Sequence, residues 1–113
     1  MPKTKGYKMA YFDEQTVNDV WEKATVVAGA DANILRKDYA GAWIKKSDYG
    51  DCDSQYGWEI DHQKPVSKGG TNSLSNLQPL QWENNRSKGD DYPKWTTSVS
   101  SYGASNVYLA KFW

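Results

Sequence analysis

One histidine and its acidic neighbour are the first residues of this sequence that could do chemistry. His62 is the only histidine in the chain, and it directly follows Asp61. A neutral imidazole, with an ordinary pKa of about 6.5, can accept a proton near physiological pH, and a carboxylate can bind a hard cation. A lone Asp-His pair is more often solvated or satisfied within the core, so the pair alone assigns no function.

The sequence around this pair carries further spaced residues. Residues 57–90 read GWEIDHQKPVSKGGTNSLSNLQPLQWENNRSKGD. The string contains an acid-histidine pair, a proline, a Gly-Gly loop, an asparagine at position 76 and the segment NNRSKGD. In these features it closely resembles the signature of the HNH endonucleases, in the variant with asparagine as the last residue. The resemblance to small free-standing HNH proteins extends to both sides of this string.

The resemblance implies a ββα-metal site that contains one base and one divalent metal ion. His62 would be the general base that takes a proton from the attacking water. Asp61 and Asn85 would bind the metal, while Asn76 would hold the loop and orient the histidine. Asn84 is an alternative metal ligand, but Asn85 is favoured because the following RSKGD then aligns with the family.

The implied reaction is hydrolysis of phosphodiester bonds in DNA, and the ligand types predict which metal takes part. Asp61 and Asn85 both offer oxygen, which favours Mg²⁺ or Mn²⁺ over Zn²⁺. Many HNH proteins also hold a structural zinc ion with pairs of cysteines. Here Gln81 and Asn84 stand at two of those positions and Cys52 is the only cysteine, so we expect no structural zinc.

Basic residues flank the expected site. Arg86 and Lys88 lie beside Asn85, and Lys64 and Lys68 lie in the loop after the histidine. Such residues commonly neutralise phosphates, although a solvated basic face is the alternative. The chain has 14 basic and 14 acidic residues, so its net charge alone does not indicate nucleic acid. We expect DNA as the partner, with RNA left open, and a targeting partner or a homodimer to supply specificity.

Local patterns predict the elements that position these residues. Apolar residues at helical spacing predict a helix over residues 15–28, with Thr16 and Asp19 as a capping box. Two short aromatic segments, residues 40–44 and 56–60, predict a hairpin. The last twenty residues carry too weak a pattern to predict an element.

The motif region reads as strand, loop, strand and helix. Residues 62–75 are rich in loop formers, and residues 76–80 form an edge strand because Pro79 cannot donate to a ladder. Residues 82–90 predict a short helix. We therefore expect a single α+β domain over residues 1–113, with a ββα-metal core at about 57–90 and an N-terminal helix.

Several side chains near the motif have structural interpretations. Glu59 shares a strand face with Asp61 and is either a supporting group or a surface carboxylate. Trp58, Trp82 and Trp95 are expected to belong to the core.

Two other functions remain open beside the endonuclease. One is a catalytically silent HNH-fold protein that binds nucleic acid, and the other is a nuclease toxin module. The complete set of motif residues favours an active enzyme, and the start at Met1 favours a free-standing protein. No apolar run approaches the ~18 residues of a membrane helix, and residues 1–12 lack the apolar stretch of a signal peptide, so we expect a cytoplasmic protein without a membrane partner.

Overall fold

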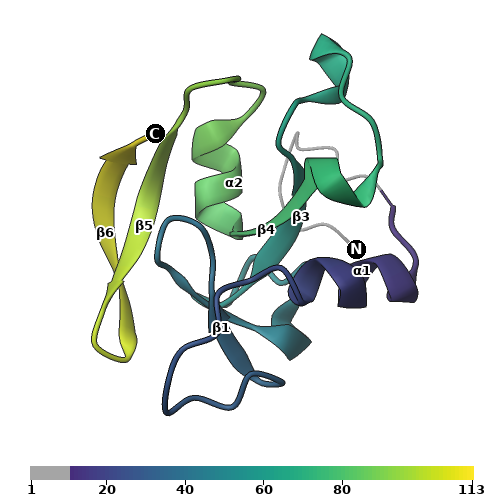
Figure 1. The fold of residues 1–113 in the computed structure, drawn as a ribbon. Helices are drawn as coiled ribbons and strands as arrows, with labels where there is room; N and C mark the ends of the chain where they lie inside the picture. The colour runs from purple at the N-terminus through teal and green to yellow at the C-terminus, as the bar shows by residue number, and fades with distance from the viewer. Residues whose placement is uncertain (1–10) are drawn as a thin grey trace.

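Three antiparallel two-stranded ribbons and two α-helices make up the fold of residues 11–113, which the computed structural model describes (Figure 1). Residues 1–10 lie outside the described part, and they include most of the segment 1–12 that was predicted not to be a signal peptide. The elements are α1 (Glu14–Trp21), β1 (Leu35–Lys37), β2 (Trp43–Lys45), β3 (Trp58–His62), β4 (Leu77–Gln81), α2 (Trp82–Lys88), β5 (Thr96–Tyr102) and β6 (Ser105–Phe112). The predicted α+β class is confirmed. Within the described residues, no helix is both long and apolar enough to span a membrane.

Helix α1 begins one residue earlier and ends seven residues earlier than the predicted helix over residues 15–28. Its N-cap is Asp13, whose carboxylate accepts the Thr16 backbone N–H at 2.9 Å, so the predicted capping box at Thr16 and Asp19 is wrong. Beyond Trp21 the chain leaves the helix, and the backbone of Thr25 pairs with that of Lys37 in an isolated bridge. Tertiary pairing therefore overrides the helical spacing of residues 22–28.

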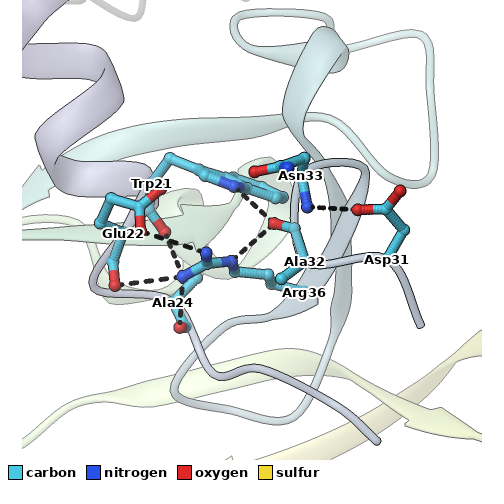
Figure 2. A network of polar contacts seen from close by, with 7 residues as sticks. All are labelled: Trp21, Glu22, Ala24, Asp31, Ala32, Asn33 and Arg36. Atoms are coloured by element: carbon cyan, nitrogen blue, oxygen red, sulfur yellow. Dashed lines mark hydrogen bonds and ion pairs between the residues drawn. The ribbon is translucent and has the colours of Figure 1, made fainter. Parts of the chain in front are cut away.

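The buried side chain of Arg36 shows what replaces the missing helical turns (Figure 2). Its Nη1 donates to the carbonyls of Trp21, Glu22 and Ala24 at 3.5, 3.1 and 3.4 Å. Its Nε donates to the Ala32 carbonyl at 2.8 Å, and that oxygen also accepts the Trp21 indole N–H at 3.0 Å. The guanidinium thus satisfies carbonyls at the end of α1 that further helix would otherwise have bonded.

The predicted hairpin between residues 40–44 and 56–60 is wrong. Strand β2 pairs with β1, and β3 pairs with β4. Residues 46–57 fold back so that Tyr49 forms a bridge with Trp58, and this connection carries β3 away from β2. One backbone hydrogen bond joins the neighbourhood of the two segments, from the N–H of Lys45, just after the first, to the oxygen of Tyr56 in the second.

The β3–β4 ribbon and helix α2 form the ββα unit. Asp61 lies opposite Gln78 and Ile60 opposite Pro79, which confirms the strand predicted for residues 76–80. The Gln81 side chain caps α2 by accepting backbone N–H groups of the first turn, and the predicted short helix is confirmed over Trp82–Lys88. The helix stops at Gly89, as its left-handed φ of 53° permits.

One face of this ribbon belongs to the core. Trp58, Ile60 and Leu77 are buried there against Val20 and Trp21 of α1. Because side chains alternate along a strand, the residues between them face the other way, toward α2. The same strand therefore supplies both the core and the polar face of the site.

The C-terminal hairpin β5–β6 is the element for which local pattern gave no prediction. It packs beside α2, on the side of the helix away from β3 (Figure 1). The buried Asn84 side chain joins the two elements: its Oδ1 accepts the N–H groups of Ser98 and Val99 at 2.9 and 2.7 Å, and its Nδ2 donates to the Val99 carbonyl at 2.8 Å. Of the three expected core tryptophans, Trp58 is fully buried, while Trp82 and Trp95 are partly exposed.

Candidate active site

Two carboxylates of β3 face two polar residues of α2. Glu59 and Asp61 lie two residues apart on one strand face, while Asn85 and Lys88 lie three apart on one helix face. The Asn85 amide donates to Glu59 Oε1 at 2.9 Å, and Lys88 Nζ lies 3.3 Å from Asp61 Oδ2. The exposed fractions are 0% for Glu59, 6% for Asp61, 3% for Asn85 and 1% for Lys88. Together they form a buried polar layer between strand and helix.

Asp61 is surrounded by donors. Gln78 Nε2 donates to its Oδ2 at 3.0 Å, and the Lys88 ammonium contacts both carboxylate oxygens. Burial raises the pKa of Asp61, while the Gln78 hydrogen bond and the Lys88 charge act against this rise. Lys88 Nζ also donates to the backbone oxygen of His62 at 3.1 Å, so one ammonium joins the acid to its neighbour.

His62 ends β3 and is partly exposed. Its ring lies 5.8 Å from that of Phe12, and its Nε2 lies 2.6 Å from Asn72 Oδ1. Because an amide oxygen can only accept, this contact requires the proton of a neutral His62 to be on Nε2. With the amide in this orientation, Nδ1 is the nitrogen that can accept a proton.

The loop between His62 and β4 is tied together by Asn76. Its Oδ1 accepts the Lys64 N–H at 2.9 Å, and its Nδ2 donates to the carbonyls of Lys64 and Thr71 at 3.0 and 2.8 Å. Gly70 runs so close to this clamp that an added Cβ would lie 1.7 Å from the Lys64 oxygen. Asn76 therefore bonds the start of the loop and Thr71, the residue before Asn72, which is the partner of His62.

The two adjacent asparagines of α2 point to different neighbours. Asn84 is bonded to β5 and donates to Asp38 Oδ2 at 3.0 Å. Burial raises the pKa of Asp38, against hydrogen bonds that lower it. Asn85 instead meets Glu59 of β3. Asn85 is thus the asparagine that shares the polar layer with Asp61.

The four expected phosphate-binding residues differ in their positions. Arg86 is exposed and lies over the Trp82 ring at 4.3 Å, and Lys64 and Lys68 are exposed in the loop. Lys88 does not lie on the surface, because its ammonium is buried on Asp61 and on the His62 carbonyl. The expected phosphate contact of Lys88 is therefore replaced by an internal ion pair.

The donor set near Asp61 fits a hard divalent ion that keeps part of its water. In residues 11–113, no cluster of three or more His, Cys, Asp or Glu side chains could enclose a metal ion. Asp61 and Asn85, on the facing strand and helix, each carry a side-chain oxygen, and Mg²⁺ commonly takes only one or two protein ligands besides water and phosphate oxygens. The Lys88 ammonium already lies 3.3 Å from Asp61 Oδ2, so a divalent ion on Asp61 would have to displace this ammonium or share the carboxylate with it.

Sequence reasoning named the acid, the histidine and the asparagines as candidates but missed the contacts that surround them. Asn72, the partner of His62, and Gln78, the partner of Asp61, gave no signal by type or spacing. Glu59 was recognisable as sharing a strand face with Asp61, yet its bond to Asn85 depends on where α2 packs.

Residues 48–91 match the family model described as HNH endonuclease. No curated protein and no solved structure matches the chain. The matched residues include β3, the loop tied by Asn76, β4 and α2, which together carry the polar layer and His62. In residues 48–91 the chain is therefore similar to the HNH endonucleases, and this similarity indicates a nuclease.

Proposed function

We propose that this protein is a metal-dependent DNA endonuclease in which His62 is the general base. The observation that carries the proposal is the position of His62 at the end of β3, one residue from the buried Asp61, in a segment that matches the HNH endonucleases. Hydrolysis of a phosphodiester needs an activated water and compensation of negative charge at the phosphate. A histidine base beside an oxygen-donor site for a cation meets both needs.

In the proposed mechanism His62 takes a proton from the attacking water through Nδ1. Its other nitrogen is held by Asn72 at 2.6 Å, which fixes the tautomer and the ring orientation. Asn76 acts as a positioning residue, because it holds the loop that carries Asn72. The imidazole is thereby ready to accept a proton without reorganisation.

Asp61 and Asn85 would hold one divalent ion, Mg²⁺ or Mn²⁺, and no structural zinc takes part. The ion would supply positive charge against the scissile phosphate and the leaving oxygen. Glu59 orients the amide of Asn85, and Lys88 offsets the buried charge of Asp61. These two residues support the metal ligands without touching the substrate.

The substrate would lie across the exposed cations of the loop and helix. Lys64, Lys68 and Arg86 are exposed and are the proposed phosphate contacts. We propose that residues 1–113 act as one nuclease domain, and that a targeting partner or a second copy of the chain supplies specificity.

Cleavage of supercoiled plasmid tests the proposed function. Purified protein is incubated with plasmid in Mg²⁺, in Mn²⁺ and in EDTA, and an Asp61→Asn variant is assayed beside it. We expect nicked or linear product with either ion, none in EDTA and little with the variant. Folded protein that leaves the plasmid intact with both ions, or that cuts equally well in EDTA, would contradict the proposal.

A further inference from the structure

A small cavity with cationic and amide side chains lies beside the proposed active site. Its volume is about 190 Å³, and Lys23, Lys37, Tyr39, Gln63 and Gln78 contribute to its lining. No carboxylate is among the residues that line it. The lining therefore favours an anionic ligand that can also exchange hydrogen bonds with amides.

The cavity is joined directly to the catalytic residues. Gln78, in its wall, donates to Asp61 at 3.0 Å. Gln63, also in its wall, follows His62 in the chain, and its backbone N–H donates to the Asn76 oxygen at 2.7 Å. A ligand in the cavity would thus contact Gln78, which bonds Asp61, and Gln63, which follows His62 in the chain.

Tyr39 gives the cavity an aromatic surface. The side chain is 58% exposed although it packs on two tryptophans, with ring centroids 4.5 Å from Trp113 and 6.3 Å from Trp95. A ring supported in this way loses little freedom when a second ring stacks on it. Exposed aromatic rings next to cations are the usual binding surface for bases of single-stranded nucleic acid.

The two lysines can serve a phosphate. Lys23 Nζ donates to the carbonyls of Leu74 and Leu77, and an ammonium has three N–H donors, so the contacts within residues 11–113 leave one for a ligand. Lys37 Nζ lies 4.8 Å from the centre of the Trp43 ring, and among residues 11–113 it forms no ion pair.

We propose that this cavity binds one nucleotide of the substrate strand, with the base against Tyr39 and the phosphate near Lys23 and Lys37. The inference rests on the proposed nuclease function and specifies its substrate. The cavity is smaller than the ~300 Å³ usual for drug-sized ligands, so we expect it to take a single base. The bound nucleotide is therefore unpaired, and single-stranded DNA should bind more tightly than duplex.

Binding of a labelled oligonucleotide tests the role of Tyr39. The His62→Ala background prevents cleavage, and fluorescence anisotropy in Mg²⁺ gives Kd. We expect Tyr39→Ala to weaken binding of single-stranded DNA about fivefold to 150-fold, the range for loss of one stacked base, and Tyr39→Phe to retain it. Tyr102→Ala is the matched control, since Tyr102 is 83% exposed at the turn of the β5–β6 hairpin and should leave Kd unchanged.

A second experiment leaves the aromatic cluster intact. Oligonucleotides with a single abasic position are bound one by one to the protein with Tyr39 present. The proposal predicts one position at which loss of the base weakens binding as much as Tyr39→Ala does, with no further loss when both changes are combined. Equal binding at every abasic position, or additive losses, would overturn it even if Tyr39→Ala folds poorly.

The result can be separated from failure of the nuclease proposal. Plasmid cleavage by the wild type, together with Tyr39→Ala affinity equal to that of wild type, would overturn the nucleotide site alone. Absence of cleavage by wild type under every metal condition would overturn the nuclease function on which the site rests. Tighter binding of duplex than of single strand would contradict the unpaired nucleotide.

Discussion

At the scale of single residues, the site depends on side chains that hold other side chains in place. Asn72 fixes Nε2 of His62, and Lys88 offsets Asp61. Neither residue touches the substrate in the proposed mechanism. Substitutions of Asn72 or Lys88 should therefore lower the rate of cleavage or the stability of the site more than its affinity for DNA.

Asn72→Ala should lower kcat about tenfold to 100-fold and leave KM nearly unchanged, because the imidazole loses the acceptor that sets its tautomer. Steady-state cleavage of a defined oligonucleotide measures both constants. Asn72→Asp keeps an acceptor oxygen and should retain most of kcat. Equal rates for Asn72→Ala and wild type would remove Asn72 from the mechanism.

Lys88→Met should lower the free energy of unfolding by about 3 kcal/mol, because it leaves the buried carboxylate of Asp61 without its ion-pair partner. Urea unfolding at neutral pH measures the change. Arg86→Met, on the exposed side of the same helix, is the control and should stay within about 0.5 kcal/mol of wild type. A Lys88→Met variant as stable as this control would show that the Lys88–Asp61 ion pair does not contribute to the free energy of unfolding.

At the scale of elements, two adjacent asparagines of helix α2 have different roles: one is structural, and the other belongs to the proposed active site. Asn84 faces β5, and Asn85 faces β3. We expect Asn84→Ala to cost about 2–4 kcal/mol of stability, because several buried partners lose their bonds. Asn85→Ala should chiefly weaken Mg²⁺ binding, measured by calorimetry beside thermal melting of both variants. Weaker metal binding in a stable Asn84→Ala protein would reverse the two assignments.

The N-cap of α1 makes one contribution to stability depend on pH. Its hydrogen bonds with Thr16 hold the pKa of Asp13 below the usual 3.8. A lowered carboxyl pKa stabilises the fold fully above the unfolded value, and this stabilisation is lost as pH falls through the folded pKa.

The stability difference between wild type and Asp13→Ala should therefore be full at pH 7 and shrink on acidification below pH 3.8. Urea midpoints at several pH values measure this difference. Asp13→Asn, which keeps a capping oxygen but does not titrate, should keep its advantage over Asp13→Ala at every pH. A pH-independent difference for wild type would show that the Asp13 carboxyl group is not titrating in this range.

Elements with strong local signals could be predicted, and those set by distant contacts could not. Pro79 and Gly89 mark the strand and the helix of the ββα unit, and both elements were predicted nearly to their ends. The end of α1 is bonded to Arg36, fifteen residues beyond Trp21 in the chain, and β5 is bonded to the buried Asn84. Neither contact can be predicted from the spacing of residues along the chain.

At the scale of the whole molecule, one ribbon presents the core on one face and the buried polar layer on the other. The face of β3 that carries Trp58 and Ile60 packs on α1, while the other face supplies Glu59 and Asp61 to α2. The acid, the histidine and Asn85 could be placed from the family resemblance. The layer of bonds around them arises only when α2 packs between the β3–β4 ribbon and the C-terminal hairpin (Figure 1).

The most direct test of the account is the single-turnover cleavage rate of His62→Ala against wild type, on a defined DNA substrate in saturating Mg²⁺. Loss of a general base typically costs about 10²–10⁴-fold in rate, so the variant should be at least about 100-fold slower while DNA and Mg²⁺ binding stay close to wild type. A variant that cleaves at the wild-type rate would show that His62 is not the base and would contradict the proposed mechanism.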